Sequence, residues 1–322
     1  MSSNSLGLVL RKGAVGALAA AALTLAAGGA TAQTYGFATL QPGTLNHTSA
    51  SAVAKVLKEK ASLNVLVQPT AGDQVIIPMV GRGEAELGIS NAMEVHEGLS
   101  KDFKDLRIIV AAHALRVGFF VRKDSNIRTI ADLRGKRVPY GFSAMRALEP
   151  TVRAMLAAAD LSEKDIKPVL VPNVIRSADD FVSGAADAFY FAFGAPKVRE
   201  VDVTVGGIRM TEIDEKGMPA ARKIERWGYL TDVQPEPVFV GVEKPMKVYS
   251  FDNLIFTNAK MSDDFVYKIL DTMVKNQPDL IAVQPVLREL SAPFAYKQYE
   301  AAYHPGALKY FKEHNLAPRP LE

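Results

Sequence analysis

Short apolar runs alternate with helical patterns along this chain. The run at 35–40 has the length of a buried strand and ends at a Gln-Pro-Gly turn. Beyond that turn, apolar residues recur at spacings of three and four between 50 and 57, which predicts an amphipathic helix capped by Thr48 or Ser49. Alternation of strands and helices is typical of α/β proteins with parallel sheets.

The same rhythm continues to the C-terminus. Further strands are expected at 65–68, 86–90, 106–112, 117–122, 136–140, 168–171, 188–191, 208–211 and 247–258. Further helices are expected near 74–82, 150–159, 179–183, 196–201 and 220–227, and after Ser262, which can cap a helix. No fixed period relates the halves of the chain, so no internal repeat is predicted.

Two of these extended stretches, 117–122 and 247–258, can carry the chain between two lobes. Two crossings are what a hinged clamshell requires. We therefore predict an α/β fold of the two-lobed periplasmic binding protein type, with a mixed, mainly parallel sheet in each lobe. The expected first lobe comprises 33–117 and 250–322, and the second comprises 118–249.

The N-terminus has the three parts of a secretory signal peptide. Arg11 and Lys12 precede the apolar run 14–27, and the small residues at 30–32 form a cleavage site before Gln33. The alternative, a membrane-spanning helix, needs about 20 apolar residues, more than this run contains. We expect residues 1–32 to be removed and the protein to be periplasmic.

Charge and cysteine content exclude several classes of protein. The formal net charge is +3, and loss of the signal peptide removes two positive charges, so the mature chain is nearly neutral. Such a chain, without a block of basic residues, gives no electrostatic case for binding nucleic acid or an anionic membrane. The absence of cysteine from the sequence excludes disulfides, thiolate nucleophiles and thiolate metal ligands.

Four segments, spread between residues 68 and 313 of the mature chain, lie in the same order as in one receptor family. They are QPTAGDQVIIPMVGRGEAELGISN at 68–91, IRTIADLRGKRVPYG at 127–141, SADDFVSGAADAFYFAFGAP at 177–196 and YHPGALKYFKE at 303–313. In these segments the chain resembles the TAXI solute receptors of TRAP transporters. The resemblance implies a small organic acid or acidic amino acid as ligand, TRAP membrane subunits as partner, a monomer and no cofactor.

Two loops depart from that family's pattern. QPGTLNHT at 41–48 stands where the family has a loop rich in glycine and tyrosine, and Met145-Arg146-Ala147 replaces Ser-Gly-Thr. A receptor of an ABC importer with the same clamshell fold is the alternative among binding proteins. A clamshell enzyme is the alternative from another class.

The first candidate ligand segment begins at the end of a strand and ends at a helix start. In a clamshell fold, ligands bind where strand ends and helix N-termini converge. Backbone N–H groups at this helix start can hold an anion. The candidate contacts here are Thr39, Asn46, His47, Thr48 and Ser49, although Thr48 and Ser49 can equally spend their hydroxyls on capping the helix.

Three further loops supply the remaining polar candidates. Gly72 lies in a turn that lets backbone approach a ligand closely, or is an ordinary turn residue. Asn91 presents an amide at a strand end, or caps the next helix. Tyr140 and Arg146 flank a loop in the second lobe. The planar guanidinium of Arg146 is expected to bind a carboxylate through two hydrogen bonds, and the alternative is that Arg146 is an ordinary surface arginine.

Aromatic residues near the Gly-Ala-Pro turn are expected to form one wall of the cleft. Tyr190, Phe193 and Gly194 are the candidates, and Phe193 is favoured over Phe189 and Phe191 because alternate aromatics on a strand usually face the core.

Catalytic chemistry finds little support in the sequence. Ser143 lies in a strand-to-helix turn that resembles a nucleophile elbow without its second glycine. Its partners would be His304, which lies inside the closing receptor motif, and Asp271 or Glu289. We therefore expect no enzyme activity.

The histidines are scattered and match no metal-binding spacing, so no metal site is expected. One of them, His96, stands beside Glu94 and Glu97, and this group is expected to form a solvated helix face.

Overall fold

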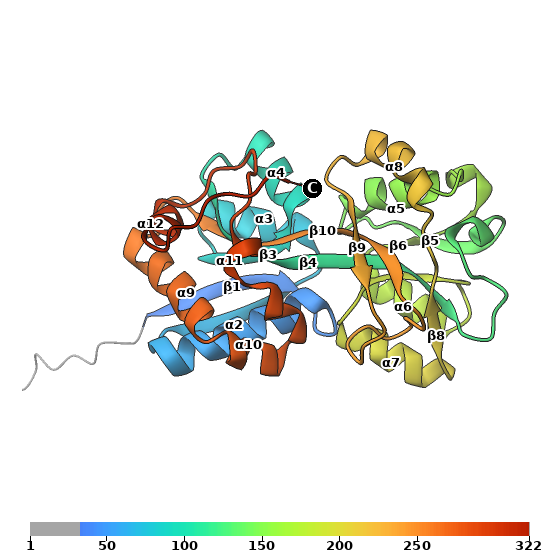
Figure 1. Ribbon diagram of the computed structural model, residues 1–322, viewed down its shortest axis with the longest axis horizontal. Coiled ribbons are helices and arrows are strands. Elements are labelled where there is room, and N and C mark those ends of the chain that lie inside the picture. The colour runs from blue at the N-terminus through green and yellow to red at the C-terminus, as the bar shows by residue number, and fades with distance from the viewer. Residues whose placement is uncertain (1–32, 322) are drawn as a thin grey trace, which may run out of the picture. The chain divides into compact units, whose positions relative to one another are not determined.

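Two long strands, β4 (Leu106–Arg122) and β10 (Met246–Asn258), run antiparallel through both lobes (Figure 1). The computed structural model describes residues 33–321, so the predicted signal peptide at 1–32 lies outside the described residues. The stretches expected at 106–112 and 117–122 form the single strand β4. Both predicted crossings are therefore present as neighbouring strands of one sheet.

The first lobe contains the strand order β2-β1-β3-β10-β4, in which β1 pairs parallel with β2 and β3. Neighbouring residues of β1 face opposite sides: Phe37 packs with α2 and α9, and Ala38 belongs to the core that includes α3. Helices thus cover both faces of this sheet. The elements of the lobe besides β4 and β10 are β1 (Thr34–Leu40), α2 (Leu45–Ala61), β2 (Asn64–Thr70), α3 (Asp73–Arg82), β3 (Leu87–Asn91), α4 (Ala92–Lys101), α9 (Asp263–Lys275), α10 (Gln277–Val283), α11 (Ala292–Ala295) and α12 (Pro305–Glu313).

The second lobe is built around the far halves of the long strands. β7 and β8 pair antiparallel with β4, β9 pairs antiparallel with β10, and β5 pairs parallel with β6. The elements of the lobe are β5 (Arg137–Gly141), α5 (Leu148–Ala157), β6 (Lys167–Val171), α6 (Val174–Val182), β7 (Phe189–Ala192), α7 (Pro196–Val205), β8 (Ile208–Met210), α8 (Met218–Ile224) and β9 (Tyr229–Val233).

This architecture confirms the predicted two-lobed fold with mixed sheets. Parallel pairing joins β1 to β2 and β3, and β5 to β6, whereas the long strands pair antiparallel with all the neighbours described above. The antiparallel part follows from the return crossing, because β10 leads the chain back into the lobe that β4 leaves. Among the described helices, none combines the length and the apolarity needed to cross a bilayer.

Two predicted helix starts are wrong. Helix α2 begins at Leu45 and is capped by Thr44, whose hydroxyl accepts a hydrogen bond from the backbone N–H of His47 at 3.2 Å, so neither Thr48 nor Ser49 caps it. Helix α6 begins at Val174, five residues before the expected start, and is capped by Asn173. In both cases an earlier polar residue satisfies the first-turn N–H groups, and the apolar periodicity extends back to it.

Candidate functional site

A cavity of about 40 Å³ lies where the two lobes meet, beside the long strands. Its first-lobe wall is formed by the end of β1 and the start of α2, at Leu40, Thr44, Leu45 and Asn46. Its second-lobe wall is formed by the starts of α5 and α6 and by β7, at Met145, Leu148, Val174, Tyr190, Phe191 and Ala192. Leu115 and Val117 of β4 and Phe251 of β10 complete the lining.

Three helices begin in the wall of this cavity. Leu45, Leu148 and Val174 are the first residues of α2, α5 and α6, and all three line it. The first-turn N–H groups of a helix have no acceptor within the helix and carry partial positive charge. None of the lining residues is charged. The electrostatic environment therefore favours a negatively charged group without supplying a cationic side chain.

Polar side chains in the lining are few. Thr44 is already committed, because its hydroxyl donates to Gln41 O at 2.7 Å and accepts from His47 N. The Tyr190 hydroxyl is buried and has no hydrogen-bonding partner among residues 33–321. Burial raises the pKa of Tyr190 well above its ordinary value, so the phenol keeps its proton. Asn46, the third polar residue, takes part in a hydrogen-bonded chain described below.

The other candidates of the first loop lie around this cavity without lining it. Thr39 and Ser49 are fully buried, and within the described part of the chain their hydroxyls have no partner. Thr48 donates to Thr44 O at 3.0 Å and lines an open groove of about 670 Å³ beside α7. His47 is partly buried, which lowers its pKa. Of the five predicted residues, the structure brings only Asn46 into the cavity.

Gly72 and Asn91 lie at the junction in structural roles. A Cβ on Gly72 would stand 1.7 Å from Ala144 O of the second lobe, so glycine is required for this close approach. The Asn91 side chain accepts from Glu94 N at 2.9 Å and caps α4, which agrees with the alternative that the sequence left open.

Tyr140 and Arg146 also lie away from the cavity. The Tyr140 side chain is buried, and burial, followed by the charges of Glu163 and Glu149, raises its pKa to about 12. Arg146 is exposed at the rim of a separate hollow of about 260 Å³ that Asp73, Gln74 and Glu94 also line. The geometry does not bring its guanidinium to the cavity, and its grip on a carboxylate stays a prediction.

Phe191, and not Phe193, lines the cavity. Phe193 packs at 5.0 Å from Phe120 and 5.7 Å from Phe239 between ring centroids, within the core of the second lobe. Gly194 adopts a φ of +76° and lines the open groove near α7. The preference for Phe193 is therefore wrong for this cavity. The strand ends at Ala192, so the expected alternation does not carry on to residue 193.

A buried carboxylate pair, which no sequence pattern predicted, lies at the same junction. Glu94 is 3 % exposed and accepts from Ala147 N of the second lobe at 3.0 Å and from the Gln74 amide at 3.2 Å. Burial, and then the charge of Asp73, raises the pKa of Glu94 to about 8. Asp73 is also buried, which raises its pKa, and it accepts from Ser90 at 2.6 Å. The expected solvated face at 94–97 is wrong for Glu94.

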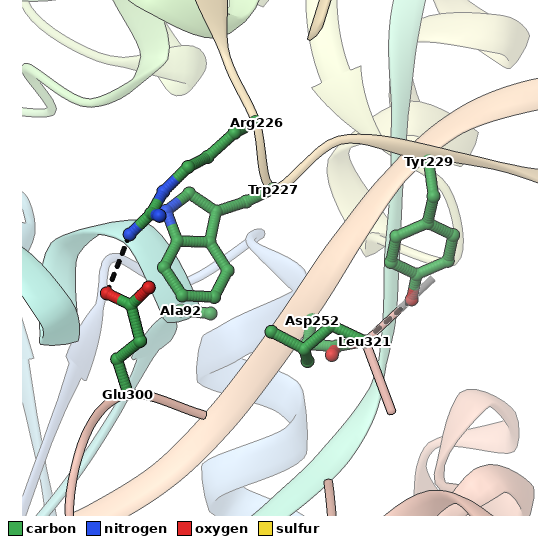
Figure 2. Close-up of a pocket in the computed structure, with 7 residues that line it drawn as sticks. All are labelled: Ala92, Arg226, Trp227, Tyr229, Asp252, Glu300 and Leu321. Atoms are coloured by element: carbon green, nitrogen blue, oxygen red, sulfur yellow. Dashed lines mark hydrogen bonds and ion pairs between the residues drawn. The ribbon is translucent and has the colours of Figure 1, made fainter. Parts of the chain in front are cut away.

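A second cavity, of about 200 Å³, lies on the other face of β10 (Figure 2). Phe251 lines the first cavity and Asp252 the second, because neighbouring side chains of a strand point to opposite faces. Figure 2 shows Arg226 reaching Glu300, at 2.7 Å, beside the Trp227 indole. Lys297 already pairs with Asp252 at 2.8 Å. The charges here are balanced within the chain, so we take the first cavity as the candidate site.

The catalytic alternative meets a geometric obstacle. His304 caps α12: its Nδ1 accepts from Gly306 N at 3.1 Å, and its Nε2 lies 3.0 Å from Met261 O. Both ring nitrogens are engaged in backbone hydrogen bonds, so the ring is not poised to take a proton from Ser143. Among residues 33–321, no group of three or more His, Asp or Glu side chains is arranged to hold a metal ion.

These features define a two-lobed periplasmic binding protein fold with a cavity at the junction of its lobes. A family model matches residues 37–314, and the chain belongs to the NMT1-like family.

Solved structures match the fold at low sequence identity. PhnD1 from Prochlorococcus marinus, in complex with methylphosphonate, matches with a TM-score of 0.57 and 10 % identity, covering 88 % of this chain and 99 % of that one. The amino acid ABC transporter substrate-binding protein AbpA from Streptococcus pneumoniae, bound to L-arginine, matches with a TM-score of 0.50 and 14 % identity, covering 79 % of this chain and 94 % of that one.

Proposed function

We propose that this protein is a periplasmic receptor that captures a small solute between its lobes and presents it to the membrane subunits of an importer. One observation carries the proposal: the cavity is walled by both lobes, and three helices begin in its wall. A ligand held there contacts both lobes at once. Closure of the lobes over it then creates a surface that a transporter can distinguish from the open form.

The ligand that fits best is a small molecule bearing a carboxylate or a similar anion. Helix N-termini attract negative charge, and no acidic side chain lines the cavity to oppose it. This agrees with the organic acid or acidic amino acid implied by the sequence resemblance. The anion does not require Arg146, since three helix N-termini, where the helix dipole is positive, lie in the cavity wall.

Access to the cavity requires the lobes to separate. A volume of about 40 Å³ is far below the roughly 300–1,000 Å³ of typical ligand pockets. We propose that the first lobe comprises 33–117 and 250–322, the second comprises 118–249, and the hinge lies near 116–118 and 249–253. The pairs Val117 with Tyr249 and Arg116 with Ser250 join the two crossings at this level.

Membrane subunits of the ABC type are the better supported partner, because AbpA, which matches over most of both chains, serves an amino acid ABC transporter. TRAP membrane subunits are the second candidate, favoured by the four sequence segments that resemble TAXI receptors. The genes next to this one distinguish the two: an ATPase gene supports the first, and TRAP membrane-subunit genes support the second.

The test of the receptor function begins with protein exported to the periplasm. N-terminal sequencing is expected to find Gln33 first, and an intact Met1 on soluble functional protein would contradict export. Mass spectrometry of small molecules released by denaturation identifies the solute. Re-addition of that solute at a hundredfold excess over Kd is expected to stabilise the fold by about 2.7 kcal/mol. A released molecule that is chemically converted by the protein would instead support an enzyme.

A further inference from the structure

A buried chain of polar side chains runs from the candidate cavity into the sheet. The Asn253 amide nitrogen lies 3.1 Å from Asn46 Oδ1 and 3.2 Å from His113 Nε2. The other ring nitrogen, His113 Nδ1, lies 3.0 Å from Ala114 O. Asn253 and His113 are fully buried, and Asn46, which lines the cavity, is 3 % exposed. Each hydrogen bond in this series restricts the orientation of the next side chain.

The direction of each hydrogen bond follows from the backbone end of the chain. A carbonyl oxygen can only accept, so His113 Nδ1 must carry the proton that it donates to Ala114 O. Burial lowers the pKa of His113, so the ring is neutral and Nε2 is an acceptor. Asn253 must then turn its NH₂ group toward Nε2. The second proton of that NH₂ group points at Asn46 Oδ1.

Asn46 is thereby left with a hydrogen-bond donor to offer. Its oxygen is held by Asn253, and its own NH₂ group makes only a long contact of 3.5 Å with Ile89 O. The Tyr190 hydroxyl in the opposite wall keeps its proton and has no partner among residues 33–321. The third polar residue of the lining, Thr44, is committed to its own helix. Asn46 thus presents a donor, and the Tyr190 hydroxyl can donate as well.

The local strand geometry is also special at this point. His113 pairs with Asn253, but the next residue of β10, Leu254, pairs with Ala111, so the register shifts and Ala112 is the extra residue of a bulge. A bulge redirects side chains relative to a regular ladder and is frequent beside functional sites. Here it lies directly beside the two residues that orient Asn46.

We propose that Asn253 and His113 are positioning residues that fix Asn46 as a donor, so that the receptor selects a solute with an acceptor-only group, such as a carboxylate, sulfonate or phosphonate, and rejects an ammonium group. This specificity rests on the proposed receptor function. The directions of the hydrogen bonds between Asn46, Asn253 and His113 do not depend on that function, and they can be tested without any ligand.

The first experiment measures the tautomer of His113 by two-bond ¹H–¹⁵N correlation spectra of the mature protein at pH 7, assigned with His113→Gln. The expected result is a proton on Nδ1 alone. A proton on Nε2 alone would overturn the proposal, because Asn253 would then turn its oxygen to the ring and Asn46 would present an acceptor. A doubly protonated ring would overturn it as well.

The second experiment uses Asn253→Asp to reverse the direction of the hydrogen bonds that join Asn46, residue 253 and His113. A carboxylate at 253 accepts from both sides, so His113 gains a proton on Nε2, and Asn46 turns its NH₂ group away from the cavity and its oxygen toward it. The probes are butyrate and butylamine, followed by ligand-observed NMR. We expect the wild type to prefer butyrate and the variant to lose about ten- to a hundredfold of that preference, the usual effect of one hydrogen bond to a charged group.

Two variants at His113 and one control variant separate positioning from damage to the fold. His113→Gln can keep an acceptor opposite Asn253 and is expected to retain the preference, whereas His113→Leu is expected to lose it. Asn315→Asp makes the same chemical change at an exposed site after α12 and is expected to change nothing.

The outcomes distinguish failure of this inference from failure of the proposed receptor function. A preference of the wild type for butylamine, equal binding of both probes or of neither, or an unchanged preference in Asn253→Asp would overturn the inference. The receptor function would still stand in each of these cases if a solute that co-purifies with the protein also stabilises it. If no solute co-purifies and none stabilises the fold, the receptor function itself fails.

Discussion

The carboxylate of Asp252 on β10 lies 2.8 Å from the ammonium group of Lys297, and both side chains are almost completely buried. Tyr229 and Tyr299 donate hydrogen bonds to the same carboxylate at 2.6 and 2.5 Å. The Lys297 ammonium also lies 4.2 Å from the centroid of the Phe294 ring. This cluster fastens the C-terminal segment to a strand that passes between the lobes.

Loss of one partner of this pair leaves a buried charge uncompensated. Lys297→Met is therefore expected to lower the free energy of unfolding by about 3–5 kcal/mol, measured by urea denaturation. The double variant Lys297→Met with Asp252→Asn is expected to recover part of that loss. The control Lys275→Met, in an exposed pair with Asp271, is expected to cost under about 1 kcal/mol. An equal, small effect of the two lysine variants would contradict this account.

Stability is expected to fall as the pH rises through the range in which Glu94 ionises. The folded state raises the pKa of Glu94 from 4.5 to about 8, so between these values the folded protein binds more protons than the unfolded chain. The free energy of unfolding then decreases with rising pH, by at most about 1.4 kcal/mol per pH unit for one proton.

Denaturation series at pH 5, 6, 7 and 8 test this. Glu94→Gln keeps an oxygen for Ala147 N and is expected to flatten the dependence, whereas Glu97→Gln in the same helix is expected to retain it. In Glu94→Gln, part of the decrease in the free energy of unfolding with pH remains if Asp73, whose pKa is also raised, keeps its proton at low pH. Identical pH profiles for Glu94→Gln and the wild type would refute the assignment.

Gly72→Ala is expected to hold the lobes apart. The φ of Gly72 is 173°, an extended conformation that alanine adopts freely, so the obstacle to a Cβ is the carbonyl group of Ala144 in the other lobe. We expect a larger radius of gyration by X-ray scattering at saturating solute and a weaker affinity. Ala71→Ser adds an atom at the exposed neighbouring position and is the matched control. A scattering curve that matches the wild type would argue against closure at this contact.

Intrinsic fluorescence is expected to report closure without any label. Trp227 is the single tryptophan of the sequence and lies in the segment between α8 and β9. Its ring centroid is 5.3 Å from that of His96 on α4 and 6.5 Å from that of Tyr299. Separation of the lobes would expose the indole, so addition of solute is expected to shift emission to shorter wavelength. An emission maximum unaffected by solute that stabilises the protein would show that this contact does not open.

Much of the fold could be predicted because apolar periodicity reports burial directly. The run at 35–40, the helix after Ser262 and the stretch 247–258 correspond to β1, α9 and β10 within a residue or two. The start of α2 could not be predicted in this way, since Thr44 and Thr48 are both adequate caps by residue type. Only the burial of Leu45 against the other lobe decides between them.

Of the residues predicted to contact a ligand, Asn46 and Tyr190 line the candidate cavity, because both lie where elements begin or end at the junction. Their contact with a ligand stays a prediction. Glu94, His113 and Asn253 were missed. A polar residue within an apolar or mixed run has no sequence signal for its partners, since those partners are 53, 140 and 207 residues away in the contacts described above.

The strand β4 spans 17 residues, about 55 Å of extended chain, and supplies paired backbone to both lobes. Neither lobe can therefore be excised at a linker and kept intact, because a cut near residue 117 divides a strand that pairs with β10 on one side of the cut and with β7 and β8 on the other. We expect calorimetry to show a single cooperative transition. In amide exchange, the central part of β4 is expected to be the last segment to take up deuterium.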